Sequence, residues 1–155
     1  MQLETKNDLD QATIEALQEL IQINRESERG FREAAERVSE ESLARLFQRL
    51  ADDRAGNAAD LGRYVVINGE SIQAEGSYLE SLHRAWIAIR SALTANDSHA
   101  LLREAERGED HIKHAYEDVL KRTAGSAMND VLNSQYGNVK AGHDRIRDLR
   151  DRCKG

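Results

Sequence analysis

The sequence predicts an all-α fold, an antiparallel four-helix bundle with an additional C-terminal helix, and three observations support this prediction. Apolar residues recur at spacings of three and four along most of the chain, as they do in amphipathic helices. Proline is absent from all 155 residues, and aromatic residues make up only 5% of them. Because sandwiches and barrels usually need proline and glycine in their many turns, this composition disfavours a β fold.

The first two predicted helices are long and antiparallel. An apolar stripe follows Asp8, which is a suitable N-cap, and continues without a slip to about Val38. Ser39 begins a short polar break, after which a second stripe runs from residue 43 to about residue 67. Since so short a connection brings consecutive helices side by side, we expect these two helices to pack as a hairpin.

Asn68 and Gly69 end the second predicted helix. An Asn-Gly pair also favours the type I′ turn of a β-hairpin, but residues 70–76 lack the alternating apolar pattern of a returning strand. We therefore interpret the pair as a helix C-cap that opens a linker of about seven to nine residues. Such a linker spans roughly 25 to 30 Å when extended. This length permits a crossover along the bundle, and a simple up-and-down turn is the alternative.

Three further apolar stripes predict helices at about 77–95, 98–123 and 126–152. Polar breaks at residues 96–98 and 125–126 separate them. A chain of this length most simply forms one domain. We therefore assign residues 1–155 to a single helical-bundle domain, with bundle helices at about 8–123 and a C-terminal helix at about 126–152.

The charge balance and the apolar runs exclude several kinds of partner. Twenty-two basic and 28 acidic residues give a net charge of −6, so the broad electropositive face of a nucleic-acid-binding protein is missing. No apolar run approaches the roughly 18 to 20 residues that span a bilayer, and no signal peptide is recognisable. The single cysteine, Cys153, cannot form an internal disulfide. We expect a cytoplasmic protein that binds neither nucleic acid nor a membrane.

The common catalytic motifs are missing from the sequence. It contains no P-loop, no Gly-x-Gly-x-x-Gly after a strand, no Gly-x-Ser-x-Gly elbow, no His-Glu-x-x-His and no Cys-x-x-Cys. Nucleotide-dependent and nucleophilic enzymes are therefore disfavoured, and no catalytic residue is assigned.

Polar residues interrupt the apolar stripes near the helix midpoints. Glu28, Glu109 and His143 lie on the stripes of the first, fourth and fifth helices, so we expect their side chains to point inward. An unpaired carboxylate in an apolar interior costs several kcal/mol, so it must be protonated, paired with a cation or bound to a metal ion. Together with neighbouring polar residues at similar heights, the candidate metal ligands are Glu28, Asp53, His83, Glu106, Glu109 and His143.

Two kinds of site fit these candidate ligands. Oxygen and imidazole donors without a thiolate favour iron, manganese or zinc as the cofactor. The alternative is a buried polar network with no metal and no other cofactor. In that network Glu28 pairs with Arg54, and Glu109 pairs with Arg84 or Arg90.

Four stretches of the chain resemble known proteins: NRESERGFREAA at 24–35, LHRAW at 82–86, ERGED at 106–110 and HDRIR at 143–147. In them the sequence resembles the small bacterial ferritin-like four-helix-bundle proteins of unknown function, some of which are associated with stress responses. The resemblance covers nearly the whole chain and implies a ferritin-like bundle that self-associates. Ferritin-like oxidases use two Glu-x-x-His pairs, whereas this chain has one such pair in the predicted bundle, Glu80 with His83. A complete ferroxidase centre is therefore not predicted.

Two functions are consistent with these observations. The first is binding of a divalent metal in the bundle core, with a role in stress or metal handling. The second is a non-catalytic bundle for structure or self-association, with a buried polar network and no metal. We also expect a homodimer or larger oligomer, because several apolar residues lie beside the main stripes, where a single copy would leave them exposed. These residues are Leu20, Ile23, Val66, Ile87 and Leu101.

Overall fold

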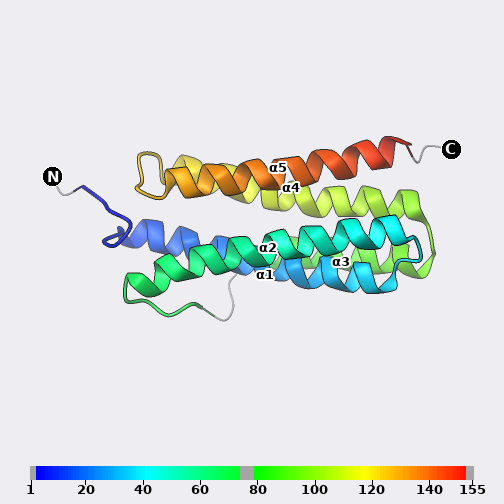
Figure 1. The fold of residues 1–155 in the computed structure, drawn as a ribbon, viewed down its shortest axis with the longest axis horizontal. Helices are drawn as coiled ribbons and strands as arrows, with labels where there is room; N and C mark the ends of the chain where they lie inside the picture. The colour runs from blue at the N-terminus through cyan, green and yellow to red at the C-terminus, as the bar shows by residue number, and fades with distance from the viewer. Residues whose placement is uncertain (1–2, 74–78, 153–155) are drawn as a thin grey trace.

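A computed structural model describes residues 3–73 and 79–152 of the chain. These residues form five helices and no strand (Figure 1). The helices are α1 (Gln11–Arg37), α2 (Glu41–Ile67), α3 (Leu79–Thr94), α4 (Ser98–Arg122) and α5 (Asn129–Arg152). The predicted all-α class is confirmed, and each helix lies within a few residues of its predicted bounds. None of the described helices is both long and apolar enough to cross a membrane.

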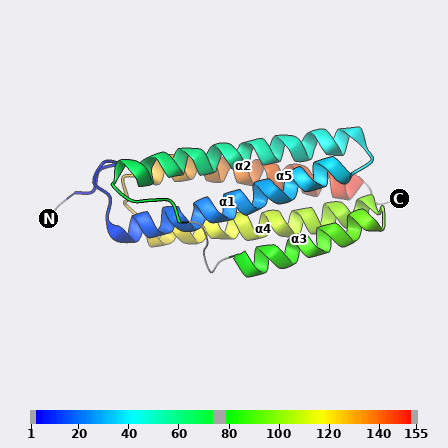
Figure 2. The ribbon, with the colours of Figure 1, turned by 90° about the horizontal axis from the view of Figure 1, so that it is seen from below.

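Four long helices form the bundle, and the short helix α3 packs on its outside. α2 contacts α1 and α5, and α4 contacts α5 and α1, which closes a ring of four. α3, with 16 residues, contacts α1 and α4 (Figure 2). The sequence predicted the C-terminal helix as the addition to the four, whereas α3 is the additional helix. α5 belongs to the four because its Leu132, Val139 and Ile146 are fully buried.

Contacts at the two ends of the bundle fix the helix directions. At one end the Leu9 amide donates to Asn68 Oδ1 over 2.8 Å, so α1 begins where α2 ends. At the other end Ser98 Oγ donates to Glu40 Oε1 over 3.1 Å, so α2 and α4 begin together and run parallel. The chain is therefore at one end of the bundle at Asn68 and at the other end at Asp97, and α3 lies between these two points in sequence. Of the two predicted connections, the structure has the crossover (Figure 1).

Two glutamines of α1 hold the first part of this crossover against the bundle. Gln18 Nε2 donates to the Ser71 carbonyl over 2.8 Å, and Gln18 Oε1 accepts from the Gln73 amide over 3.0 Å. Gln22 also donates to the Gln73 carbonyl. These bonds explain why both glutamine side chains are buried, and they direct the linker along α1.

Aromatic packing fixes α3 on the bundle. The rings of Phe31 and Phe47 are stacked with centroids 5.9 Å apart, and Trp86 of α3 meets Phe31 edge-on at 5.1 Å. Gly30 of α1 lies under the indole, where a Cβ atom would come within 2.2 Å of the ring. A glycine at this position therefore allows α3 to approach α1 closely.

The apolar residues beside the main stripes are largely covered within one copy of the chain. Leu20, Ile23 and Leu101 are buried, because α1 and α4 each contact three other helices. Val66 and Ile87 remain exposed, at 59% and 50%. Most of the apolar surface that suggested a homodimer is therefore already buried in the monomer.

Candidate functional site

A fully buried ion pair lies at the centre of the bundle. Arg54 of α2 donates from Nη2 to Oε2 of Glu109 on α4, and both side chains are 0% exposed. Gly142 of α5 lies directly against the pair, since a Cβ atom there would be 3.2 Å from both Arg54 Nη2 and Glu109 Oε2. Because glycine has no side chain, residue 142 leaves room for the two charged groups where α2, α4 and α5 meet.

Burial dominates the electrostatics of this pair. It raises the pKa of Glu109 above its ordinary value, and the charges of Arg54 and His143 offset only part of that effect. Within the described part of the chain, Glu109 Oε1 and Arg54 Nε and Nη1 have no hydrogen-bond partner. A buried pair with unfilled hydrogen-bonding capacity contributes little net stability, although removing one partner alone is strongly destabilising.

A second polar layer lies one to two helical turns from the ion pair and joins all four bundle helices. Asn24 of α1 donates to the Tyr116 hydroxyl of α4 over 2.9 Å, and that hydroxyl donates to Gln135 Oε1 of α5 over 2.8 Å. Asn57 of α2 donates to Asn24 Oδ1 over 3.3 Å. Burial raises the pKa of Tyr116, so its hydroxyl keeps its proton and remains a donor.

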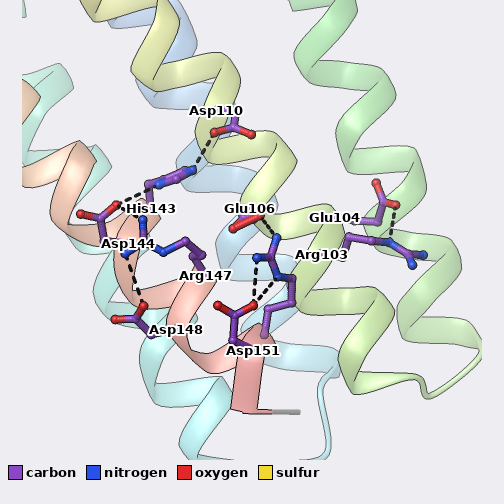
Figure 3. Close-up of polar contacts among 10 residues, drawn as sticks. Arg103, Glu104, Glu106, Asp110, His143, Asp144, Arg147, Asp148 and Asp151 are labelled. Atoms are coloured by element: carbon purple, nitrogen blue, oxygen red, sulfur yellow. Dashed lines mark hydrogen bonds and ion pairs between the residues drawn. The ribbon is translucent and has the colours of Figure 1, made fainter. Parts of the chain in front are cut away.

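His143 connects α5 to α4 at the edge of the core. Its Nε2 lies 2.6 Å from Asp110 Oδ1, and its Nδ1 lies 3.1 Å from Asp144 Oδ1 (Figure 3). A neutral imidazole donates from one nitrogen only, so the imidazolium form alone donates to both carboxylates. The hydrogen bond from His143, with the charge of Arg147, lowers the pKa of Asp144. His143 thus links α5 to α4 through its contact with Asp110.

Three of the other predicted ligands, Glu28, Asp53 and Glu106, form no hydrogen bond or ion pair with Glu109 in the described part of the chain and lie in surroundings of their own. Glu28 accepts from Arg32 on its own helix over 2.9 Å. Glu106 accepts from Arg150 of α5. Asp53 is exposed. The side chain of the remaining candidate, His83, lies outside the described part of the chain.

Among the described residues, no three His, Cys, Asp or Glu side chains form a group that could hold a metal ion. The pairing predicted for the metal-free alternative also differs in detail, because Arg54 pairs with Glu109 and not with Glu28. The residues that sequence reasoning did not assign to the site are Asn24, Asn57, Tyr116, Gln135 and Gly142. For Asn24 and Asn57 the available signal was their position on the apolar stripes.

Residues 12–122 match a family described as a domain of unknown function, DUF2383. The chain belongs to the DUF2383 family. The matched residues include nearly all of α1 and all of α2, α3 and α4, and α5 lies beyond them. No curated protein matches the chain.

The surface of this DUF2383 chain carries a groove between α2 and α5. The groove has a volume of about 660 Å³, and Leu46, Leu50, Gly142 and Leu149 are among its lining residues. Since Gly142 also touches the ion pair, the groove lies directly above the buried charges. The charged residues that line it are Arg49, Asp53, Asp144, Arg145, Asp148 and Arg152.

Proposed function

We propose that this DUF2383 protein is a non-catalytic helical bundle that acts by binding a protein partner, and that its buried polar residues stabilise one helix register. The observation that carries the proposal is the Arg54–Glu109 pair, because Glu109 is the most buried of the described candidate ligands. Its carboxylate already has a cation beside it. A divalent ion at the same oxygen would face the repulsion of the guanidinium in a poorly screened interior.

The remaining acidic candidates support the same conclusion. The ferritin-like resemblance implies a metal centre built from carboxylates and imidazoles. Such a centre requires carboxylates and imidazoles that are not already paired with other side chains. Glu28 and Glu106 each form an ion pair with an arginine. His143 contacts the carboxylates of Asp110 and Asp144. The described residues therefore do not fit a shared metal centre.

Buried polar groups of this kind are suited to fixing register. A helix that slides by one turn, about 5.4 Å, loses its polar partners and leaves charges unpaired in the core. Sliding an apolar stripe along another costs less, because leucine contacts are easily exchanged. A bundle held in one register presents a constant surface, which is what a binding protein requires.

Metal handling by a ferritin-like bundle is the second candidate function. One observation favours it: the ring of α1, α2, α4 and α5 is joined by a single crossover, as in ferritin-like folds. Under this candidate iron, manganese or zinc binds near Glu109, and the stress association and cytoplasmic location implied by the resemblance also apply.

Metal analysis and thermal unfolding distinguish the two candidates. Protein purified without added metal is compared by elemental analysis with the Glu109→Gln, His83→Ala double variant. Glutamine in this variant can still accept a hydrogen bond from Arg54, and circular dichroism checks the fold. Melting is then recorded with a chelator and with each of the three metals. The proposed function predicts that the wild type holds substoichiometric metal. It also predicts that neither the chelator nor any of the three metals changes the Tm of the wild type. Stoichiometric metal in the wild type that is lost in the variant, with a Tm raised by that metal, would establish metal binding instead.

A further inference from the structure

The seam between α2 and α5 is open, because no further described helix lies across it. The ring has two loosely packed seams, α1 with α4 and α2 with α5. α3 lies across the first of these (Figure 2). The second is open as the groove of about 660 Å³, and a further hollow of about 320 Å³ continues it. Asn138 lines both, so the open surface extends along much of the length of the two helices.

The charges that line this groove are balanced in number. Arg49 and Asp53 come from α2, and Asp144, Arg145, Asp148 and Arg152 come from α5. Three arginines and three aspartates therefore sum to zero, whereas the whole chain carries −6. Two copies carry like net charge and repel each other, and the groove itself adds nothing to that repulsion because its charges sum to zero.

The arginines of the groove are available to a partner. Arg49, Arg145 and Arg152 make no ion pair with another described residue, and Asp53 also makes none. Asp144 and Asp148 each contact Arg147, but a carboxylate can accept from more than one donor. A purely acidic partner would meet three aspartates, and a purely basic partner would meet three arginines. The fitting partner carries both signs in equal number on one surface.

We infer that the partner is a second copy of this chain, docked by a twofold axis through the α2–α5 grooves of both copies. A twofold interface uses the same patch on each subunit, so each contact between an arginine of one copy and an aspartate of the other occurs twice. This inference rests on the proposed function, since it names the partner of a binding bundle. Leu46 and Leu50 at the groove are already only 4% and 3% exposed, so new apolar burial is small. The dimer is therefore held mainly by charges and weakens as salt is added.

Sedimentation equilibrium of the full chain at about 50 µM, roughly tenfold above a micromolar Kd, tests the inference. In about 0.05 M salt the wild type is expected to be a dimer, and in about 0.5 M salt its dissociation constant is expected to rise at least tenfold. The acidic-face variant Arg49→Glu, Arg145→Glu, Arg152→Glu and the basic-face variant Asp53→Arg, Asp148→Arg are each expected to be monomeric. Their equimolar mixture is expected to form a heterodimer. Asp144 is kept because it accepts from His143.

A matched control reverses three charges away from the groove: Arg25→Glu on α1, Arg84→Glu on α3 and Lys121→Glu on α4, all exposed positions. This control is expected to remain a dimer although its net charge changes as much as in the acidic-face variant. Circular dichroism checks that each variant is folded. If the acidic-face variant fails to fold, the milder variant Arg49→Ala, Arg145→Ala replaces it. This variant is expected to raise the dissociation constant of the dimer tenfold or more.

The outcomes separate this inference from the proposed function. A dimeric wild type with a dimeric acidic-face variant overturns the groove as the interface and leaves a self-associating bundle. A mixture of the two reversed variants that stays monomeric also overturns it, because the charges then do not pair across a twofold axis. A wild type that is monomeric in low salt overturns the second copy as the partner. The metal analysis of the wild type and the double variant is unaffected by all three results.

Discussion

Arg54 and Glu109 occupy positions that an apolar bundle would give to leucine or methionine. Both lie on the inward stripes of their helices, and neither side chain reaches water. The attraction between the two charges is offset by the cost of removing both from water. Because the loss of either residue alone leaves the other charge unpaired in the core, the pair is a sensitive point of the molecule.

Removing one partner is expected to cost far more than removing both. Arg54→Met should lower the free energy of unfolding by about 3–5 kcal/mol, because Glu109 is left as an uncompensated buried charge. Arg54→Met, Glu109→Leu should recover most of that loss. Urea denaturation measures both. Arg63→Met is the control, since it breaks an exposed pair with Asp60 and should change stability by less than about 1 kcal/mol. Equal losses in the single and double variants would contradict this account.

The single variant should also show a stronger pH dependence of stability than the wild type, with a known sign. Burial raises the pKa of Glu109, and in Arg54→Met the opposing charge of Arg54 is gone, so the folded-state pKa rises further above its unfolded value of about 4.3. The folded chain then binds the proton more tightly than the unfolded chain. The resulting stability is present below the unfolded pKa and is lost as pH rises through the folded pKa.

Arg54→Met is therefore expected to be less destabilised at about pH 5 than at about pH 8, relative to the wild type at the same pH. Chemical denaturation at both pH values measures the difference. Arg54→Met, Glu109→Gln removes the titrating group and should lose the effect. A penalty for Arg54→Met that does not change with pH would show that Glu109 stays ionised without its partner.

Part of this site could be predicted from single residues, and part could not. The interruption of apolar stripes by Glu109 and His143 correctly placed both side chains in or near the core. Glu28 also lies on a stripe, but its side chain is only half-buried and pairs with Arg32. The reason is that the apolar stripe of the helix is wider than the surface that neighbouring helices cover. Which arginine pairs with Glu109 depends on which helices meet, and periodicity within a helix carries no information about that.

At the scale of elements, the docking of α3 rests on one small residue. The Trp86 indole covers Gly30 of α1, so the two helices are closer than an alanine would permit. The helices themselves were predictable, because each carries its own stripe and its own polar break. Which helix completes the ring of four was not predictable, because α3 and α5 have similar apolar stripes and differ mainly in length.

Gly30→Ala is expected to displace the indole and to lower stability by about 1–3 kcal/mol, as overpacking generally does. Gly56→Ala in α2 is the matched control, because a Cβ atom there meets nothing within 4 Å. That variant should be as stable as the wild type or more stable by up to about 1 kcal/mol, since alanine is the better helix former. Thermal melting and the fluorescence of Trp86 measure both effects. An unshifted emission in Gly30→Ala would contradict the close packing.

At the scale of the whole molecule, the residues matched by the family end before the fold is complete. DUF2383 is matched over residues 12–122, whereas the ring of four long helices is complete only with α5. α5 supplies Leu132, Val139 and Ile146 to the core, each 0% exposed. It also supplies Gln135, which accepts from Tyr116, and Gly142, which lies against the ion pair.

A chain that ends at residue 123 is therefore expected to lose its cooperative thermal transition. Without α5 the apolar faces of α2 and α4 are exposed to water, and each large apolar side chain uncovered costs about 1.5–3 kcal/mol. Circular dichroism melting tests this expectation. A peptide of residues 124–152 added in trans should restore the transition. A sharp melt from the shortened chain alone would show that the matched residues fold independently.

The single crossover also has a consequence for the rate at which the chain folds. α1 with α2 and α4 with α5 are hairpins of neighbouring helices, and such local contacts form quickly. Arg54 and Glu109 are 55 residues apart in sequence, so they meet only when one hairpin docks against the other. Both charges lose their water in that step, which raises its barrier. Stopped-flow refolding monitored by Trp86 fluorescence should therefore be faster for Arg54→Met, Glu109→Leu than for the wild type.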